Sequence, residues 1–272
     1  MPVPTPNTDE GRAGLAALLA APGRALLGVD FDGTLAPIVP DPAQARAHPE
    51  VASLLRRLSA HGVRVAVVTG RPAAKAVEYG GLADVPGLVV LGHYGLQRWE
   101  EGRVSTPEEA PGLARVRHRL PGLLAEAGAP EGTWVEDKGA AVAVHTRRTA
   151  EPDAAFDRLR GPLESLAAET GLVVEPGRLV IELRPPGGDK GDAMRGLADE
   201  REPSAVVFVG DDLGDLPAFA AVAELRAKGV PGLLVCSGSA EVSALAERAD
   251  LVVDGPDGVV ALLRSLLEEL DP

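Results

Sequence analysis

The sequence of 272 residues is poor in cysteine, in aromatic side chains and in basic residues. Its one cysteine, Cys236, cannot form an internal disulfide, and it lies in the apolar run Gly232–Cys236, where we expect a buried core position. A single thiol is typical of a reducing compartment, so we expect a cytoplasmic protein. Aromatic residues make up only 3% of the chain, which leaves few rings for stacking on bases or sugars.

Basic residues are outnumbered, since 27 Lys and Arg stand against 40 Asp and Glu, and the formal net charge is -13 at pH 7. Nucleic-acid backbones and anionic lipids repel such a chain. No segment reaches the roughly 18 apolar residues of a membrane span, and residues 1–11 lack the basic start and apolar stretch of a signal peptide. We expect a small-molecule substrate and no nucleic-acid or membrane partner, and we expect the chain to act as a monomer.

Short apolar runs that end in Gly or Asp alternate with Ala- and Leu-rich stretches along much of the chain. This alternation is typical of a parallel sheet whose two faces are covered by helices. The length favours one large domain or a core with a second, smaller domain. The pattern predicts strands at 25–29, 63–68, 88–91 and 205–209, and helices at 49–60, 190–199, 216–228, 241–248 and 259–270.

Between about residues 103 and 186 the pattern changes to two hairpins around one helix. It predicts strands at 134–136 and 140–145, then a helix at 151–170, then strands at 172–174 and 178–183. The sequence therefore predicts an α/β fold. A doubly wound, Rossmann-like parallel-sheet core would comprise residues 1–102 and 187–272, and residues 103–186 would form an inserted α+β cap domain with an antiparallel sheet.

The first predicted strand runs directly into the acidic motif Asp30-Phe31-Asp32-Gly33-Thr34. In a parallel sheet the carboxyl ends of the strands border the ligand crevice. Alternation along an extended segment would put the side chains of Asp30 and Asp32 on the same side. Two carboxylates so close together share a proton or a metal ion, unless they are solvated acids in an ordinary Asp-Gly turn.

Three further motifs follow at predicted strand ends or helix starts: Thr69-Gly70-Arg71, Asp189-Lys190-Gly191 and Gly210–Asp215, which reads Gly-Asp-Asp-Leu-Gly-Asp. Each has little weight alone, but together and in this order they are specific. Arg71 could neutralise substrate charge or pair with a neighbouring acid. Oxygen-only ligands at one strand edge suit a hard cation such as Mg²⁺ rather than zinc.

This set of motifs resembles the haloacid dehalogenase-like (HAD) superfamily of phosphotransferases, whose four motifs occur in this order. The resemblance implies that Asp30 is a nucleophile that becomes an aspartyl-phosphate and that Asp32 is the general acid and base. The other implied roles are phosphate binding by Thr69, Gly70, Arg71 and Lys190, and Mg²⁺ binding by Asp30, the backbone carbonyl of Asp32 and Asp211, with Asp212 and Asp215 beside these ligands.

In more detail the chain is similar to the trehalose-6-phosphate phosphatases, in the segment Leu91–Gln97 and in the cap region. The chain departs from that family at His93-Tyr94, where Asn-His is usual, at Gln97, where Glu is common, and at Gly214, where Thr is usual. The resemblance implies that cap side chains hydrogen-bond the sugar hydroxyl groups, namely Glu136, Lys138, His145, Arg147 and Glu182.

The resemblance thus implies a Mg²⁺-dependent phosphatase that hydrolyses trehalose 6-phosphate to trehalose and phosphate, the last step of trehalose biosynthesis. Two alternatives stay open: a HAD phosphatase or mutase for another sugar phosphate, such as sucrose phosphate or a hexose phosphate, and a non-catalytic sugar-phosphate-binding protein. We expect His145 and Arg147 to share one face of a strand. We expect Trp99 and Trp134 to pack in the cap or its hinge rather than to stack on sugar.

Overall fold

The computed structural model describes residues 3–106, 110–177, 179–186, 188–238 and 243–271. Internal contacts divide the chain into two compact units, Met1–Ser105 with Gly188–Pro272, here called the core unit, and Thr106–Gly187, here called the inserted unit. The sequence analysis began the inserted segment at residue 103. Residues 103–105 belong with the core unit because they form a strand of its sheet.

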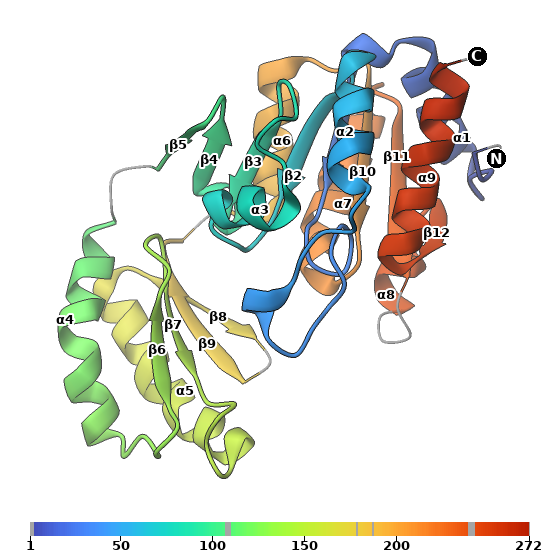
Figure 1. Cartoon of the computed structure of the whole chain (residues 1–272). Coiled ribbons are helices and arrows are strands. Elements are labelled where there is room, and N and C mark those ends of the chain that lie inside the picture. Colours follow the sequence, from blue (N-terminus) through green and yellow to red (C-terminus); the bar gives the residue numbers. More distant parts are fainter. Residues whose placement is uncertain (1–2, 107–109, 178, 187, 239–242, 272) are drawn as a thin grey trace. The chain divides into compact units, whose positions relative to one another are not determined.

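The core unit is built on one sheet, which has eight strands in the described part of the chain (Figure 1). The strands β12, β11, β10, β1, β2 and β3 pair in parallel, whereas β4 and β5 add an antiparallel edge. In spatial order the strands are β12 (Leu251–Asp254), β11 (Gly232–Gly238), β10 (Ala205–Gly210), β1 (Ala25–Val29), β2 (Arg64–Val68), β3 (Val89–Gly92), β4 (Gln97–Glu100) and β5 (Arg103–Ser105).

Helices cover both faces of this sheet, which is why its central strands are apolar without interruption. All five residues of β1 are buried. One face packs against α1, α2, α3 and α9, and the other against α6, α7 and α8. The doubly wound α/β core is confirmed. The helices are α1 (Asp9–Ala20), α2 (Val51–Ala60), α3 (Ala73–Gly80), α6 (Lys190–Arg201), α7 (Leu216–Ala227), α8 (Ser243–Ala246) and α9 (Gly255–Leu270), with short 3₁₀ turns η1 (Pro22–Arg24), η2 (Pro42–Gln44), η3 (His93–Gly95) and η4 (Leu213–Asp215).

The inserted unit contains a four-stranded antiparallel sheet in the order β6, β7, β9, β8. Both predicted hairpins are present, and the predicted residue Arg178 lies outside the described residues. Two helices, α4 and α5, pack on one face of the sheet through a separate apolar core. The elements are α4 (Pro111–Glu126), β6 (Trp134–Asp137), β7 (Val142–His145), α5 (Pro152–Thr170), β8 (Val173–Gly177) and β9 (Val180–Arg184).

Helix α4 corrects the sequence analysis, which predicted only one helix in this region. Its sequence contains the pairs Pro111-Gly112 and Pro121-Gly122, which are typical of turns. The apolar residues Leu113, Val116 and Leu120 nevertheless recur at helical spacing and are buried against α5 and the sheet. Tertiary packing therefore stabilises the helix in spite of Pro121 in its interior.

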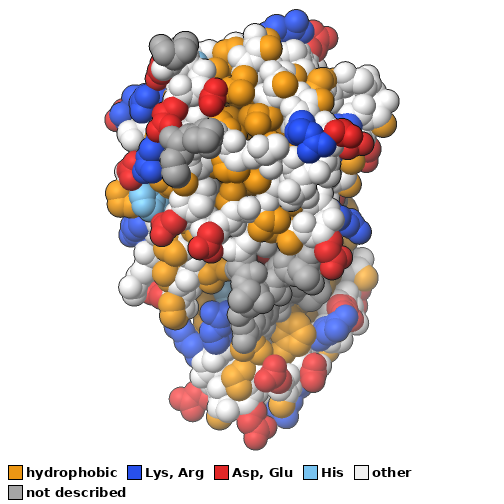
Figure 2. Space-filling model, turned by 90° about the vertical axis from the view of Figure 1, so that its right-hand side faces the viewer, with side chains coloured by type: hydrophobic (Ala, Val, Ile, Leu, Met, Phe, Trp, Pro, Cys, Tyr) orange, Lys and Arg blue, Asp and Glu red, His pale blue; other side chains and the backbone are white. Residues whose placement is uncertain are grey.

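The predicted helix at 241–248 is shorter in the structure, where α8 spans Ser243–Ala246, and residues 241 and 242 lie outside the described residues. No helix among the described residues is long and apolar enough to cross a membrane. On the face shown in Figure 2, acidic and basic side chains are interspersed, so the excess of acidic residues forms no continuous acidic surface there. Acidic residues gather instead at one buried edge of the core sheet.

Candidate active site

Asp30 lies where β1 leaves the core sheet. Its backbone N–H still donates to the carbonyl of Val209 at 2.9 Å, which extends the β1–β10 ladder by one bond. β10 ends at Gly210 and Asp211 follows it, so parallel pairing carries both acidic motifs to the same edge. The side chain of Asp30 is buried.

Lys190 is the cationic partner of Asp30. Its Nζ donates to Asp30 Oδ1 at 2.6 Å and to Asp215 Oδ1 at 2.7 Å, and all three side chains are buried. Lys190 is the first residue of α6, whose start is fixed by a capping box between Asp189 and Asp192. Burial alone would lower the pKa of Lys190, but Asp215 and Asp30 outweigh it and raise that pKa well above its usual value.

Three buried carboxylates, those of Asp30, Asp211 and Asp215, offer oxygen atoms that all lie within 4.8 Å of one another. Burial, the largest influence, raises the pKa of Asp211 to about 7, and Asp215 and Asp212 add to the shift. Burial likewise raises the pKa of Asp30 well above its usual value, although Lys190 acts against this. One ammonium group cannot balance three buried carboxylates. The donor set and its excess charge therefore fit a hard divalent cation such as Mg²⁺.

The loop that follows Asp30 fits closely against Asp211. Gly33 has a φ of +79°, and a Cβ atom built on it would lie 1.9 Å from Asp211 Oδ2, so a side chain there would displace that carboxylate. Ser237, at the end of β11, donates from its hydroxyl to the carbonyl of Gly33 at 2.7 Å. Ser237 was not among the predicted site residues. The only available signal was the position of Ser237 at the carboxyl end of an apolar run.

Asp215 and Asp212 have different surroundings. Asp215 is fully buried, and its Oδ2 accepts from the backbone N–H groups of Asp211 at 2.9 Å and Asp212 at 3.2 Å. Both of its oxygens therefore serve to hold Lys190 and the loop that carries Asp211. Asp212 is exposed and caps the following turn through Gly214 N. Of the two, only Asp215 belongs to the close carboxylate cluster in the described part of the chain.

Asp32 is held apart from Asp30. Both of its carboxylate oxygens accept from Arg71, through Nε and Nη2 at 2.6 Å each. The guanidinium group also lies 5.4 Å from the ring centres of both Phe31 and Tyr79. The two carboxylates of the motif were expected to share a proton or a metal ion. In this structure each has its own cation, Lys190 for Asp30 and Arg71 for Asp32, and a shared metal ion stays a prediction.

Thr69 follows β2 and is buried beside the same edge. Its Oγ1 accepts from the backbone N–H of Arg71 at 3.1 Å. A hydroxyl group that accepts in this way keeps its own proton for donation. Thr69 can therefore donate a hydrogen bond to an anionic ligand at the strand end.

A family model and individual relatives of this chain point to the same protein family. The family model for trehalose-phosphatase matches residues 28–253. The chain is 35% identical over 216 residues to the trehalose-phosphate phosphatase of Mycobacterium avium, which covers 75% of this chain and 53% of that protein. It is 30% identical over 204 residues to a probable trehalose-phosphate phosphatase of Sinorhizobium fredii, covering 72% of this chain and 73% of the relative. The chain belongs to the trehalose-phosphatase family.

A solved structure of similar fold is the C-terminal domain of the Candida albicans trehalose-6-phosphate phosphatase. It superimposes with a TM-score of 0.74 at 22% identity and covers 98% of this chain and 99% of that one. The Aspergillus fumigatus trehalose-6-phosphate phosphatase gives a TM-score of 0.69 at 23% identity, with coverage of 97% and 99%. At these identities the likeness shows the fold alone. The chain spans about half the length of the mycobacterial phosphatases it matches, with shares of 53% and 50% in two of them.

The sheet in the inserted unit of this trehalose-phosphatase family member has a second face, opposite α4 and α5, here called the open face. Strand pairing places Glu136, Ala143, Glu182 and Glu175 in one row across that face. Lys138 Nζ donates to Glu182 Oε2 at 2.5 Å, and His145 Nε2 lies 2.9 Å from Glu136 Oε2. The structure therefore brings together four of the five predicted sugar-binding residues.

The fifth, Arg147, is not on the strand. β7 ends at His145, and Arg147 is an exposed residue of the turn that follows, so the expectation that both share a strand face is wrong. Trp134 lies on the open face and stacks on His145 with ring centres 3.8 Å apart. Trp99, expected in the cap or its hinge, lies in β4 of the core unit and is buried in its hydrophobic core.

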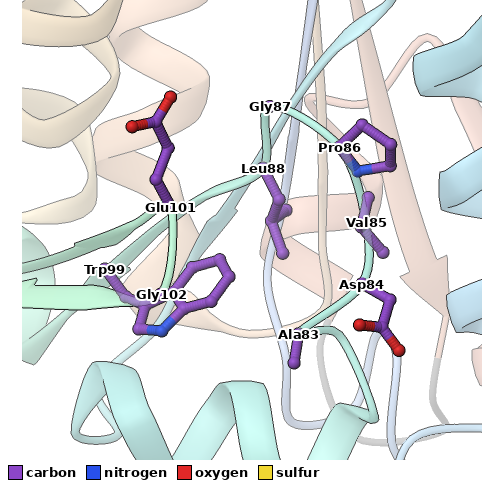
Figure 3. Close-up of a pocket in the computed structure, with 9 residues that line it drawn as sticks. All are labelled: Ala83, Asp84, Val85, Pro86, Gly87, Leu88, Trp99, Glu101 and Gly102. Carbon is purple, nitrogen blue, oxygen red and sulfur yellow. The ribbon is translucent and has the colours of Figure 1, made fainter.

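A separate cavity of about 280 Å³ lies near the amino end of β3, at the edge of the core sheet opposite Asp30. Figure 3 shows the Trp99 ring on one side and Val85 and Pro86 on the other. None of the motif residues of this trehalose-phosphatase family member lines it. The clustered carboxylates of Asp30, Asp211 and Asp215 lie at the other edge of the sheet.

Proposed function

We propose that this chain hydrolyses trehalose 6-phosphate to trehalose and phosphate through an aspartyl-phosphate on Asp30, the last step of trehalose biosynthesis. The observation that carries the proposal is the buried contact of Asp30 with Lys190 inside the cluster of Asp30, Asp211 and Asp215. Membership of the trehalose-phosphatase family supports the choice of substrate.

In the first step a carboxylate oxygen of Asp30 forms a bond to the phosphorus, and the bond between phosphorus and the sugar oxygen breaks. Asp32 in its protonated form gives its proton to the departing sugar oxygen. Lys190 and Thr69 hold the phosphoryl oxygens and offset their charge, without which an anionic carboxylate is a poor nucleophile.

In the second step Asp32 takes a proton from a water molecule, whose oxygen bonds to the phosphorus. The bond between phosphorus and Asp30 breaks, and Asp30 returns as a carboxylate. Because Arg71 donates to both oxygens of Asp32 in this structure, we propose that one of these two hydrogen bonds opens during either proton transfer while the other keeps Asp32 oriented. We propose that Arg71 then binds a phosphoryl oxygen beside Gly70.

A Mg²⁺ ion would be held by the carboxylates of Asp30 and Asp211 and by the backbone carbonyl of Asp32, with Asp215 behind them. When bound, this ion supplies positive charge that reduces the repulsion between the nucleophile and the phosphoryl group. The proposal draws its support from the buried oxygen-only donor set, which carries more negative charge than Lys190 balances.

We propose that the open face of the inserted unit recognises the sugar through Glu136, Lys138, His145 and Glu182, with Arg147 beside them. The support is their grouping on one sheet face and the scarcity of aromatic residues, at 3% of the chain. Sugar recognition would then depend on hydrogen bonds from polar side chains. A cytoplasmic location and a monomeric state also stay proposals, the former supported by the single cysteine.

The decisive experiment is a phosphate-release screen over trehalose 6-phosphate, sucrose phosphate and hexose phosphates in excess Mg²⁺. We expect trehalose 6-phosphate to be hydrolysed with the highest kcat/KM. Equal rates on all the sugar phosphates would contradict the proposed specificity. Binding of trehalose 6-phosphate without phosphate release would favour a non-catalytic binding protein.

A further inference from the structure

The turn that follows β3 has an unusual backbone. His93 and Tyr94 are consecutive non-glycine residues with φ values of 48° and 58°, and Gly95 follows with a φ of 100°. The left-handed region is unfavourable for a residue with a side chain, because its Cβ crowds the backbone. Such a conformation persists only where the surrounding structure holds it, and it is often found at functional sites.

Hydrogen bonds from this turn to the segment after β2 hold it in place. The N–H of Tyr94 donates to the carbonyl of Thr69 at 3.0 Å, and the N–H of His93 donates to the carbonyl of Arg71 at 3.0 Å. The side-chain Oε1 of Gln97 accepts from the N–H of Ala73 at 3.0 Å. Two bonds from the turn and one from the start of β4 therefore fix this region to the Thr69–Ala73 segment.

The strained turn places the phenol of Tyr94 over Gly70. A Cβ atom built on Gly70 would lie 2.7 Å from Tyr94 Oη and 2.9 Å from its Cζ, which is closer than these atoms can approach. A side chain at position 70 would therefore have to displace the phenol. Tyr94 itself is half-buried.

Gly70 directly follows Thr69, so the phenol above it lies near the edge of the core sheet that carries Asp30. Val29 and Val67 are register partners on β1 and β2, so Asp30 and Thr69 follow neighbouring strands within two residues of that pair. Tyr94 reaches this edge from β3, the next strand of the sheet. Its hydroxyl group is a neutral donor that can add to the charged donors Lys190 and Arg71.

We infer that Tyr94 is a further substrate-positioning residue, whose hydroxyl group donates a hydrogen bond to a phosphoryl oxygen of the substrate. The inference rests on the proposed function, because it places the phosphoryl group at Asp30. It adds a phosphate contact that does not come from the four motifs, and it gives a physical reason for the strained turn. Phenylalanine would fill the same space without this donor.

The test uses Tyr94→Phe, with Tyr79→Phe as the matched control, because these are the two tyrosines of the chain. Binding of inorganic phosphate to the full chain in Mg²⁺ is measured by calorimetry, together with kcat and KM for trehalose 6-phosphate. We expect Tyr94→Phe to weaken phosphate binding and to raise KM, each about tenfold, with kcat changed by less than about twofold. Tyr79→Phe should match the wild type in each quantity.

A second variant, Gly70→Ala, checks the geometry, because its new Cβ would displace the phenol. It should weaken phosphate binding at least as much as Tyr94→Phe does. Phosphate affinity in Tyr94→Phe equal to that of the wild type overturns the inference and leaves the proposed function intact. Wild-type protein that binds no inorganic phosphate and releases none from trehalose 6-phosphate overturns the proposed function, and the inference with it.

Discussion

Arg71 donates to both carboxylate oxygens of Asp32, at 2.6 Å each, while Lys190 holds Asp30 two residues earlier at 2.6 Å. The two acids of one motif therefore have separate cationic partners. This separation suits two different tasks. A nucleophile must stay charged beside the phosphoryl group, whereas a general acid and base must gain and lose a proton during turnover.

Replacing Arg71 by Lys should impair proton transfer more than phosphoryl binding. Lysine keeps the charge but cannot form the two parallel hydrogen bonds that orient Asp32. We expect kcat/KM for trehalose 6-phosphate to fall by about 10- to 100-fold. The loss should be smaller for p-nitrophenyl phosphate, whose leaving group needs no proton. Arg46→Lys is the control, since Arg46 also lies over the Tyr79 ring, at 4.1 Å from its centre. Equal losses on both substrates in Arg71→Lys would contradict this account of Asp32.

Metal binding should distinguish the neighbouring residues Asp211 and Asp212. Asp211 is buried in the carboxylate cluster, whereas Asp212 is exposed. We expect Asp211→Asn to weaken Mg²⁺ binding, measured by calorimetry, by at least about 100-fold. Asp212→Asn should stay within about tenfold of the wild type. Similar losses in both variants, or an unchanged affinity in Asp211→Asn, would contradict the proposed ligand set.

The pKa of Asp211, raised to about 7, predicts a pH-dependent cost of folding when metal is removed. A raised pKa means that the folded state binds this proton more tightly than the unfolded state does. The protonated carboxyl therefore favours the folded state fully below about pH 4, and this contribution to stability is lost as the pH rises towards 7. In a chelator, Asp211→Asn should therefore melt at a higher temperature than the wild type at pH 8. The difference should shrink towards pH 4, where both side chains are neutral. A difference that does not change with pH would contradict this.

The inserted unit offers a matched pair of glutamates in one row of its sheet. Glu182 is buried and bound to Lys138, whereas its register partner Glu175 is exposed and bound to Arg184. We expect Glu182→Gln to raise KM for trehalose 6-phosphate about tenfold and to leave KM for p-nitrophenyl phosphate unchanged. Glu175→Gln should change neither value. A loss on both substrates in Glu182→Gln would indicate a role other than sugar recognition.

The sequence could predict the central sheet and the edge that carries the chemistry. Strands such as β1 and β10 are buried on both faces, so they read as continuous apolar runs, and parallel pairing brings their carboxyl ends together. The positions of Asp30 and Asp211 follow from this rule alone. The hairpins of the inserted unit were also predictable, because turn residues separate their alternating strands.

Other features depend on geometry that no local pattern contains. Whether Arg71 pairs with an acidic side chain or binds the substrate depends on its distance from Asp32, which the sequence does not contain. Ser237 reaches Gly33 only because β11 ends at the same edge of the sheet. Helix α4 was hidden by its prolines, and α1, α3, β4 and β12 were not predicted either. The predicted strand 140–145 ends where β7 ends, at His145, and the error on Arg147 came from extending its alternation two residues beyond that end.

The most direct test of the central claim is to identify the residue that carries the phosphoryl group. Asp32→Asn should slow hydrolysis of the intermediate, so acid-quenched samples with trehalose 6-phosphate in Mg²⁺ are digested and analysed by mass spectrometry. The account predicts a phosphorylated peptide that contains Asp30, and no such peptide and no turnover in Asp30→Asn, which should remain folded by circular dichroism. Phosphate release by folded Asp30→Asn at a near-normal rate, or a phosphoryl group on another residue, would contradict it.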